Sequence, residues 1–177
     1  MSESIFRYAG PPLLEVCRSS DAGYTAVWVE QAGGLPGVII VVERADLAVL
    51  FVRQWRPSVA SEVWQLPRGY SDDRDSGPLD SARRELYEET GILATHGELM
   101  GSLLVDPGIT SSAPTVVRCW SADETISTGF ASQLDENIDE VAWVTVDEVD
   151  AWIAKGVLTD ALSLAALMLH RAGRPTG

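Results

Sequence analysis

The stretch RRELYEETGI, residues 83–92, decides the interpretation of this 177-residue chain. It holds three glutamates and two arginines, and it ends on a glycine followed by an isoleucine. Residues three and four apart on an α-helix lie over one another, so Glu85, Glu88 and Glu89 are expected to share a face. Carboxylates at this spacing repel one another unless positive charge lies among them. The stretch therefore predicts a helix that attracts cations.

Helical spacing extends from Pro78 to Thr90, with Leu79, Ala82 and Leu86 on the apolar side and Gly91 as the C-terminal stop. Mg²⁺ takes oxygen ligands, and a few carboxylates with waters and substrate phosphates complete its shell. A bound ion of this kind activates water and neutralises charge on a phosphate. The alternative interpretation is a solvent-exposed acidic helix end. The helix macrodipole argues against this alternative, because it disfavours carboxylates near a helix C-terminus.

Strand patterns surround this helix, rich in Val, Ile and aromatic residues and separated by turn residues. Before it come LLEVC, YTAVWVE, GVIIVVE and LAVLFVRQW, with ERAD as a hairpin turn between the last two. After it come LMGSLLV, TVVRCWSA and EVAWVTV, and then two expected helices, Val146 to Lys155 and Thr159 to Arg171. Strands, a central helix, strands and terminal helices favour an α+β sandwich over a parallel doubly wound sheet.

Composition limits the domain count and the class of partner. A chain of 177 residues with 46% hydrophobic content suits a single domain, residues 1–177. Lys+Arg of 13 against Asp+Glu of 26 gives a formal charge of -13. Nucleic-acid binding needs clustered cations, so this charge argues against a nucleic-acid partner.

Cysteine, histidine and hydropathy patterns point to a reduced, cytoplasmic protein. Cys17 and Cys119 lie far apart in the sequence and form no zinc-ligand spacing with His96 or His170. The start MSESIFRYAG lacks the pattern of a signal peptide, and no apolar run approaches the length of a membrane span. We therefore expect no membrane role.

A family signature extends from Gly69 into the acidic helix. Together Gly69, Arg84, Glu85, Leu86, Glu88, Glu89, Gly91 and Ile92 resemble the signature of the Nudix hydrolases. The family pattern is Gly, five residues, Glu, seven residues, then Arg-Glu-aliphatic-any-Glu-Glu-any-Gly-aliphatic. The second half matches at every fixed position. The first half departs from it, because Asp75 stands where the family has Glu and the loop SDDRDSGP carries one extra residue.

The resemblance implies a fold and an assembly. The expected fold is a Nudix-type α/β/α sandwich with a mixed β-sheet and an additional N-terminal antiparallel sheet. Residues 1–34 would then form N-terminal strands and residues 35–177 the Nudix core. The resemblance also implies a homodimer with exchanged N-terminal strands, in which residues before Val42 contribute to the partner's substrate site.

The resemblance also assigns roles around a Mg²⁺ site, with Mn²⁺ as a substitute. Glu85 and Glu89 would be the principal metal ligands, and Glu88 an additional ligand or a base acting through water. The carbonyl of Arg68 would add a ligand from the preceding loop. The positions of structural support are Gly69, Arg84 and Gly91, of which Arg84 would orient the acidic cluster by charge-assisted hydrogen bonds.

Within the family, the resemblance points to the ADP-ribose pyrophosphatase branch. It rests on VRQWRP followed by WQLPRG, on Pro107 fifteen residues beyond Ile92, and on GVLTDALSLAALML near the C-terminus. It implies hydrolysis of ADP-ribose to AMP and ribose 5-phosphate. Gln65 stands where many relatives carry an acid, which keeps nucleotide sugars, dinucleotides and flavin cofactors open as substrates. A nucleotide-binding module without catalysis is the alternative from another class.

Further residues are candidates for the chemistry of the substrate. The resemblance matches Glu136, in LDENIDEVAW, to a glutamate that approaches the attacking water, although a solvated acidic loop explains it equally. Guanidinium groups present paired donors to phosphate oxygens. The candidate phosphate ligands are Arg53, Arg56 and Arg118, each of which is otherwise a surface strand residue. Trp28 and Trp55 are candidates for stacking on adenine, although strand tryptophans more often lie in a core.

Overall fold

The buried run GVIIVVE forms β4 (Gly37–Glu43), the strand around which the molecule is built. The computed structural model describes residues 2–10, 13–21, 24–31, 35–121 and 138–173. Every residue of β4 is buried, and its side chains alternate between two hydrophobic clusters. Ile39 and Val41 join one cluster, and Val38, Ile40 and Val42 join the other. The continuous apolar run is thus explained by a strand covered on both faces.

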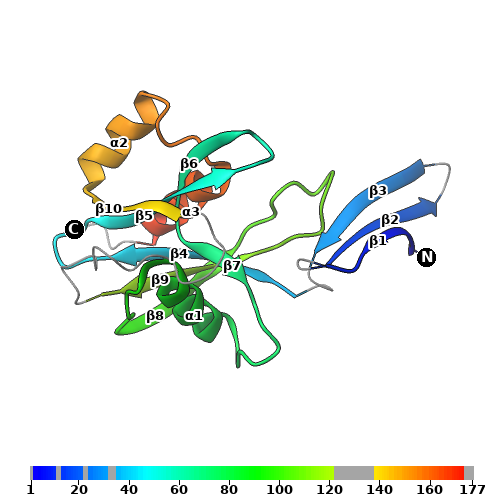
Figure 1. Ribbon diagram of the computed structural model, residues 1–177, viewed down its shortest axis with the longest axis horizontal. Helices are drawn as coiled ribbons and strands as arrows, with labels where there is room; N and C mark the ends of the chain where they lie inside the picture. Colours follow the sequence, from blue (N-terminus) through cyan, green and yellow to red (C-terminus); the bar gives the residue numbers. More distant parts are fainter. Residues whose placement is uncertain (1, 11–12, 22–23, 32–34, 122–137, 174–177) are drawn as a thin grey trace.

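The main sheet has the order β10-β5-β4-β9-β8, with β6 paired to β5 and β7 paired to β4 (Figure 1). These strands are β5 (Val49–Arg56), β6 (Ser61–Gln65), β7 (Arg68–Tyr70), β8 (His96–Ser102), β9 (Thr115–Trp120) and β10 (Ile138–Val144). The β4–β9 pair is parallel and the other pairs are antiparallel. The predicted mixed sheet is therefore confirmed.

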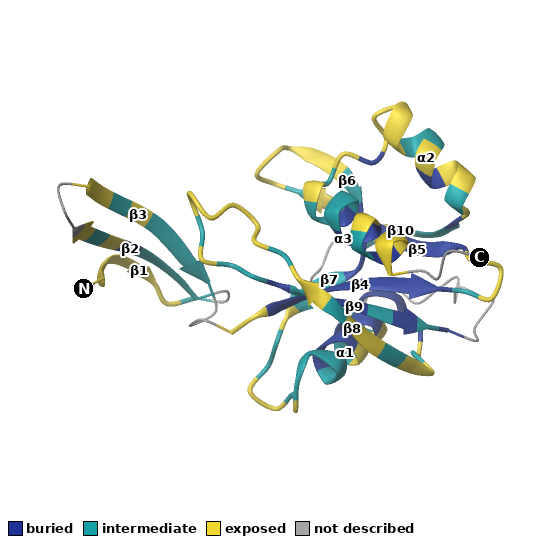
Figure 2. Cartoon of the chain, turned by 180° about the vertical axis from the view of Figure 1, so that it is seen from behind, coloured by how far each residue is buried: buried dark blue, intermediate teal, exposed yellow. Residues whose placement is uncertain are grey.

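Helices cover both faces of this sheet. The helix α1 (Pro78–Thr90) lies on one face, where Ala82 and Leu86 join the cluster that contains Val38 and Ile40. The helices α2 (Val146–Ala154) and α3 (Ala161–Ala172) lie on the other, where Val149, Ala166 and Leu167 join Phe51. Figure 2 shows the buried residues concentrated along the central strands, between these helical layers. The architecture is the α/β/α sandwich that the sequence predicted.

Local sequence signals explain where the helices begin and end. Pro stands at the start of α1, and Gly91 closes it with φ 72 and a backbone N–H donated to the Tyr87 carbonyl at 2.8 Å. A capping box of Thr145 and Glu148 starts α2. The side chain of Asp160 caps α3, so this helix begins at Ala161 rather than at the predicted Thr159. No helix in the described ranges is long and apolar enough to cross a membrane.

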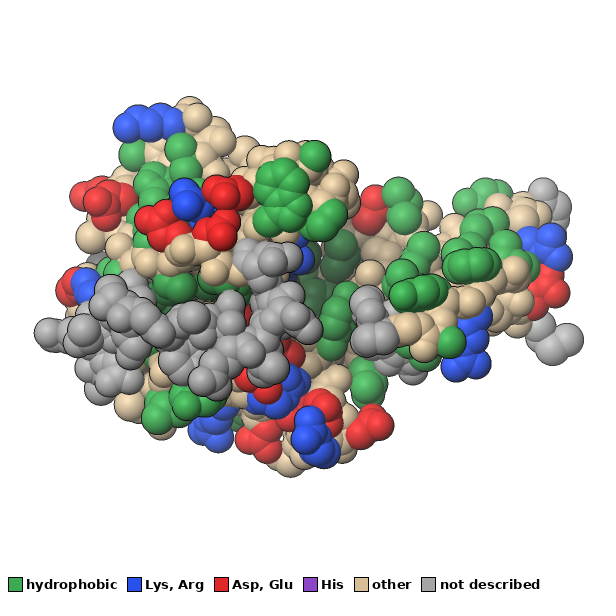
Figure 3. Space-filling view, viewed as in Figure 1, with side chains coloured by type: hydrophobic (Ala, Val, Ile, Leu, Met, Phe, Trp, Pro, Cys, Tyr) green, Lys and Arg blue, Asp and Glu red, His purple; other side chains and the backbone are tan. Residues whose placement is uncertain are grey.

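The N-terminal strands form a separate antiparallel sheet, β1 (Ser2–Tyr8), β2 (Leu14–Asp21) and β3 (Tyr24–Gln31). This sheet extends away from the sandwich (Figure 1), and apolar side chains gather on its surface (Figure 3). It meets the core where Val29 donates its N–H to the Ile109 carbonyl at 2.8 Å and accepts from Ser111 at 3.2 Å. The sequence analysis did not identify β1, whose residues are all exposed and therefore lack a burial pattern.

One strand lies elsewhere than its pattern suggested. The run LMGSLLV, residues 99–105, was expected as a strand, but β8 spans His96–Ser102. Its register shifts between Leu99 and Gly101, where Gly101 has φ 140. The chain then leaves the sheet, and the Leu103 N–H donates to the Pro114 carbonyl at 3.0 Å. The residues that follow form a loop at the edge of the sheet.

Packing of Leu86 holds α1 on the sheet. Leu86 is fully buried, so Leu86→Ala should lower the free energy of unfolding by about 3 kcal/mol through lost burial and a residual cavity. Leu99 on β8 is 55% exposed, so Leu99→Ala should change it by less than about 0.5 kcal/mol. Chemical denaturation of both variants measures the difference, and equal costs would contradict this packing.

Candidate active site

The glutamates of α1 do not share one environment. Glu85 and Glu89 are buried, with 6% and 3% of their surface exposed, whereas the Glu88 side chain is 38% exposed. Glu85 and Glu89 are four residues apart and so lie one above the other on the helix. Burial of two carboxylates is unfavourable unless hydrogen bonds or cations compensate it. Their partners therefore decide what this face of α1 can bind.

The backbone of β7 lies against both buried glutamates. A Cβ atom at Gly69 would lie 2.1 Å from Cδ and Oε2 of Glu85, so glycine is required for this close approach. The adjacent Arg68 N–H donates to Oε2 of Glu89 at 3.3 Å. The backbone between the Arg68 nitrogen and the Gly69 Cα is therefore next to both carboxylates. The proposed ligation through the Arg68 carbonyl stays a prediction.

Arg84 supplies positive charge to the acidic cluster. Its Nη1 donates to Oε1 of Glu85 at 2.8 Å and to Oε2 of Glu88 at 2.9 Å. Its Nη2 donates to the Tyr70 carbonyl at 2.7 Å and to Oδ2 of Asp75 at 3.0 Å. These bonds, first those to Asp75, raise the pKa of Arg84 further above its usual value. This geometry matches the orienting role expected for Arg84.

The extra residue in the signature loop leaves Asp75 next to the helix. Its carboxylate accepts from Arg84, from the Ser81 hydroxyl at 2.8 Å and from the Asp72 N–H at 2.8 Å. The Arg84 hydrogen bonds are the main reason that its pKa falls to about 2. Asp75 therefore anchors the residue that orients Glu85 and Glu88. The shortened acid and the inserted residue preserve a contact to the signature arginine.

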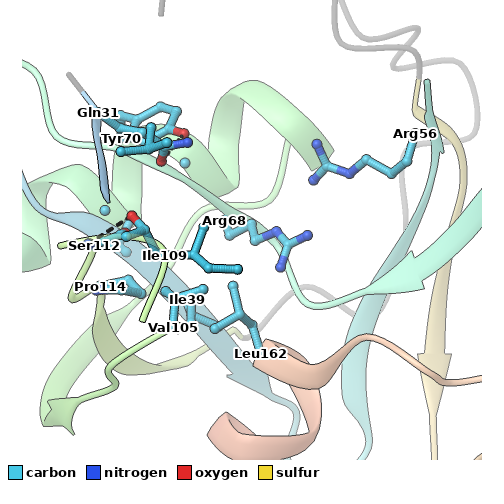
Figure 4. A pocket seen from close by; sticks show the side chains of 15 residues that line it. Gln31, Ile39, Arg56, Arg68, Tyr70, Val105, Ile109, Ser112, Pro114 and Leu162 are labelled. Atoms are coloured by element: carbon cyan, nitrogen blue, oxygen red, sulfur yellow. Dashed lines mark hydrogen bonds between the residues drawn. The ribbon is translucent and has the colours of Figure 1, made fainter. Parts of the chain in front are cut away.

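Gly69, whose backbone approaches Glu85, also lines a cavity of about 480 Å³, whose lining includes no residue of α1 (Figure 4). Arg68, Gly69 and Tyr70 form the wall next to α1. Apolar side chains from the strands, the loop after β8 and α3 form much of the remainder, namely Val29, Ile39, Val105, Ile109, Pro114 and Leu162. Such a cavity suits a flat organic group, with polar contacts at one end. The buried carboxylates of α1 and a partly apolar cavity are thus joined through Gly69.

Of the candidate substrate residues, Arg56 reaches this cavity. Arg53 forms ion pairs with Glu62 and Glu140, both at 3.1 Å, and Arg118 lies over Trp120. The remaining candidates are Trp28, which donates to Glu30 at 3.2 Å, and Trp55, which is 43% exposed. None of Arg53, Arg118, Trp28 and Trp55 lines this cavity. Glu136 lies outside the described residues.

Two residues in or near the cavity, Tyr70 and Asp160, were not predicted from the sequence. Tyr70 follows the signature glycine, and its hydroxyl donates to Oε1 of Gln31 at 2.9 Å, which ties β7 to the N-terminal sheet. Asp160 accepts from Nη1 of Arg68 at 3.1 and 3.2 Å as well as capping α3. The N-cap position before a helical run was a usable signal for Asp160. No local pattern marked the pairing of Tyr70 with a residue from β3.

Another set of potential metal ligands lies apart from α1. The ligand atoms of Glu15, Cys17 and Glu30 lie within 4.8 Å of one another on β2 and β3. Burial and then the charges of Glu30 and Glu15 raise the pKa of the Cys17 thiol. A raised thiol pKa disfavours the thiolate form that binds metals. This set belongs to the N-terminal sheet and contributes no atom to the glutamate face.

Gly69→Ala should weaken divalent-cation binding by about tenfold, because the new methyl group displaces the Glu85 carboxylate. Gly77→Ala is the matched control, since a Cβ atom there meets nothing within 4 Å. Titration calorimetry with Mn²⁺ measures the affinities, and thermal unfolding checks the fold. Equal Mn²⁺ affinity in Gly69→Ala and the parent chain would contradict the role of Glu85 in cation binding.

Asp75→Asn should lower the free energy of unfolding by roughly 2 kcal/mol at pH 7, because the folded pKa of about 2 lies below the usual 3.8. A depressed carboxyl pKa stabilises the folded state above pH 4, and this contribution is lost as the pH falls toward 2. The difference between the variant and the parent chain should therefore shrink between pH 4 and pH 2. Denaturant titrations across this range measure it, and a constant difference would refute the ion pair as its source.

Several known proteins are similar to this chain. The NUDIX domain model matches residues 34–166. An RNA pyrophosphohydrolase of Xanthomonas campestris is 38% identical over 74 residues, 42% of this chain and 34% of that protein. An ADP-ribose pyrophosphatase of Mycobacterium tuberculosis is 25% identical over 138 residues, 77% of this chain and 65% of that protein.

A solved structure described as ADP compounds hydrolase superposes with a TM-score of 0.73. The superposition covers 97% of this chain and 90% of that one, and at 19% identity it shows a common fold. The family model spans most of the chain and includes β4, α1 and the cavity wall at Arg68 and Gly69. This chain therefore belongs to the Nudix family.

Proposed function

We propose that this chain is a pyrophosphohydrolase that cleaves ADP-ribose to AMP and ribose 5-phosphate in the presence of Mg²⁺. One observation carries the proposal: the buried pair Glu85 and Glu89 adjoins, through Gly69, a cavity of about 480 Å³. Buried carboxylates beside a substrate-sized cavity are suited to hold a divalent cation against the phosphates of a bound molecule.

In this proposal the glutamates and the Arg68 carbonyl have separate roles. Glu85 and Glu89 hold the cation, with the Arg68 carbonyl and Glu88 as additional ligands. When bound, the cation lowers the pKa of water and offsets charge on the phosphates. The Glu88 side chain is 38% exposed, so of the three α1 glutamates it is the one best able to exchange a proton with water. Glu136 is the second candidate for this base.

The proposed substrate fits both the cavity and the relatives. The M. tuberculosis relative is an ADP-ribose pyrophosphatase, and its alignment covers 77% of this chain. The apolar walls suit an adenine ring, while Arg56 and Arg68 offer donors to phosphate oxygens. Other nucleoside diphosphate derivatives, such as nucleotide sugars, dinucleotides and flavin cofactors, share these two features and form the alternative substrate class.

Two further interpretations receive less support. The Xanthomonas relatives are RNA pyrophosphohydrolases, but a formal charge of -13 is unfavourable for a polyanionic substrate. A binding module without catalysis would not need the buried glutamate pair, which costs folding free energy. Use of Mn²⁺ in place of Mg²⁺, action in the cytoplasm and assembly as a homodimer through the N-terminal strands remain part of the proposal.

Glu89→Gln should lower kcat/KM for ADP-ribose by more than about a hundredfold, because it removes a charged cation ligand. Asp147→Asn, at an exposed position on α2, is the control for loss of one negative charge. The measurement is AMP release from ADP-ribose with Mg²⁺ and then with EDTA, alongside UDP-glucose and GDP-mannose. Circular dichroism checks that both variants fold.

The result separates the alternatives. Mg²⁺-dependent AMP release that Glu89→Gln abolishes would support the proposal. A tenfold preference in kcat/KM for a nucleotide sugar would displace ADP-ribose as the substrate. Full activity of Glu89→Gln would refute the metal assignment, and absence of turnover on all substrates with retained ADP-ribose binding would favour the binding module.

A further inference from the structure

Two arginines form a wall shared by two cavities. Arg56, at the end of β5, and Arg68, at the start of β7, line the cavity of about 480 Å³. Both also line a second cavity of about 640 Å³, which Ser58, Ser61 and Thr159 help to enclose. Figure 4 shows the two guanidinium groups directed toward the same region from their separate strands. A ligand that extends from one cavity into the other must pass these arginines.

Gln65 brings the two guanidinium groups together. Its Oε1 accepts from Nε and Nη2 of Arg56 at 3.1 and 2.9 Å, and from Nη2 of Arg68 at 2.8 Å. Its Nε2 donates to Oε1 of Gln54 at 2.9 Å, and the residue is completely buried. Both ends of the amide are thus engaged, which fixes the side-chain orientation. One amide oxygen positions two cations from different strands.

A neutral amide oxygen is an unusual acceptor for two guanidinium groups. Two guanidinium groups that share an acceptor repel one another, and a carboxylate would offset that repulsion. Gln65 provides the same hydrogen-bonding oxygen without negative charge. Asp160 contacts Arg68 at Nη1, on the other side of its guanidinium group from the Gln65 bond. The acceptor at the junction therefore adds no charge that would compete with an anionic ligand.

The two cavities differ in the groups that they suit. Val29, Ile39, Ile109 and Leu162 give the smaller cavity apolar walls for a base. The hydroxyl groups of Ser58, Ser61 and Thr159, with the carboxylates of Glu62 and Asp160, give the larger one polar walls that suit the hydroxyl groups of a sugar. A nucleoside in the first and a polar group in the second would bring the linking phosphates to the arginines. Gly69 and Arg68 also adjoin the buried glutamates there.

We propose that Gln65 is a positioning residue that sets the affinity of the substrate site for the linking phosphates by holding Arg56 and Arg68 on a neutral acceptor. This inference rests on the proposed function, because it takes the smaller cavity as the nucleoside site. It adds that the substrate extends across both cavities and that its diphosphate lies at their junction. The polar second cavity favours a hydrophilic group on the far phosphate.

The test compares an anionic and a neutral ligand that share one base. Gln65→Glu keeps the size and the acceptor oxygen but adds a negative charge between the arginines. Titration calorimetry with Mg²⁺ measures the Kd of α,β-methylene-ADP, which cannot be hydrolysed between its phosphates, and of adenosine. We expect Gln65→Glu to weaken α,β-methylene-ADP binding by about tenfold and to leave adenosine binding within about twofold.

Ala45→Glu is the charge control, because Ala45 is exposed in the turn after β4, at the end of that strand opposite Gly37 and the cavity. It adds the same charge to the chain and should leave both Kd values unchanged. Gln65→Glu keeps the acceptor for the arginine N–H groups but loses the hydrogen bond that Nε2 donates to Gln54, so thermal unfolding is measured alongside to report the change in stability separately. A structural role alone would alter stability without separating the two ligands.

Two outcomes would overturn the inference. An unchanged Kd ratio in Gln65→Glu would show that the charge of this acceptor does not control phosphate binding. Equal affinity of the parent chain for α,β-methylene-ADP and adenosine would show that the arginines do not bind the phosphates. Neither measurement requires turnover, so failure to hydrolyse ADP-ribose would count against the proposed function and leave this test intact.

Discussion

The structure depends on the close contact between α1 and the backbone of β7 at Gly69. Two carboxylates of α1, Glu85 and Glu89, are buried against this strand, which is unfavourable by itself. Glycine allows the strand to approach, and the Arg68 N–H and Arg84 guanidinium supply the hydrogen bonds. The face of α1 that carries the proposed cation ligands is thus part of the packing between helix and sheet. Leu86 and Ala82 hold the same helix on the sheet from its apolar side.

Charge compensation around this contact is arranged in a chain of ion pairs. Asp75 binds Arg84, and Arg84 binds Glu85 and Glu88. The signature loop, with its inserted residue, therefore still provides an acidic partner for Arg84. Asp75 is nearly buried, so its interaction with Arg84 is screened less than a surface pair. The loop and the glutamates of α1 are in this way energetically coupled.

A second chain of hydrogen bonds joins α3 to the ends of β5, β6 and β7. Asp160 caps α3 and binds Arg68, Arg68 shares Gln65 with Arg56, and Gln65 binds Gln54 on β5. The ends of three strands and one helix are thereby joined at the border of two cavities. Pyrophosphate chemistry needs positive charge on one side of the phosphates and cation ligands on the other. In the proposed function the two contact chains, which meet at Arg68 and Gly69, supply these groups.

The sequence by itself determined the parts that depend on local periodicity and on short motifs. The limits of α1, its buried face, the stop at Gly91 and the central strand followed from spacing and from helix-end signals. The acidic helix also identified the family, because the signature residues lie within a few turns of one another. The orienting position of Arg84 was predictable for the same reason.

Only the tertiary structure decided which of the candidate residues meet. Arg53, Arg56 and Arg118 are indistinguishable as strand arginines, yet Arg53 pairs with Glu62 and Glu140 while Arg56 lines the cavity. Strand β1 has no buried face, so hydropathy does not reveal it. Only its pairing with β2 in the structure identifies it as a strand. The interaction of Gln65 with two arginines joins residues from three strands. Such contacts depend on sheet order and on side-chain direction, which no local pattern encodes.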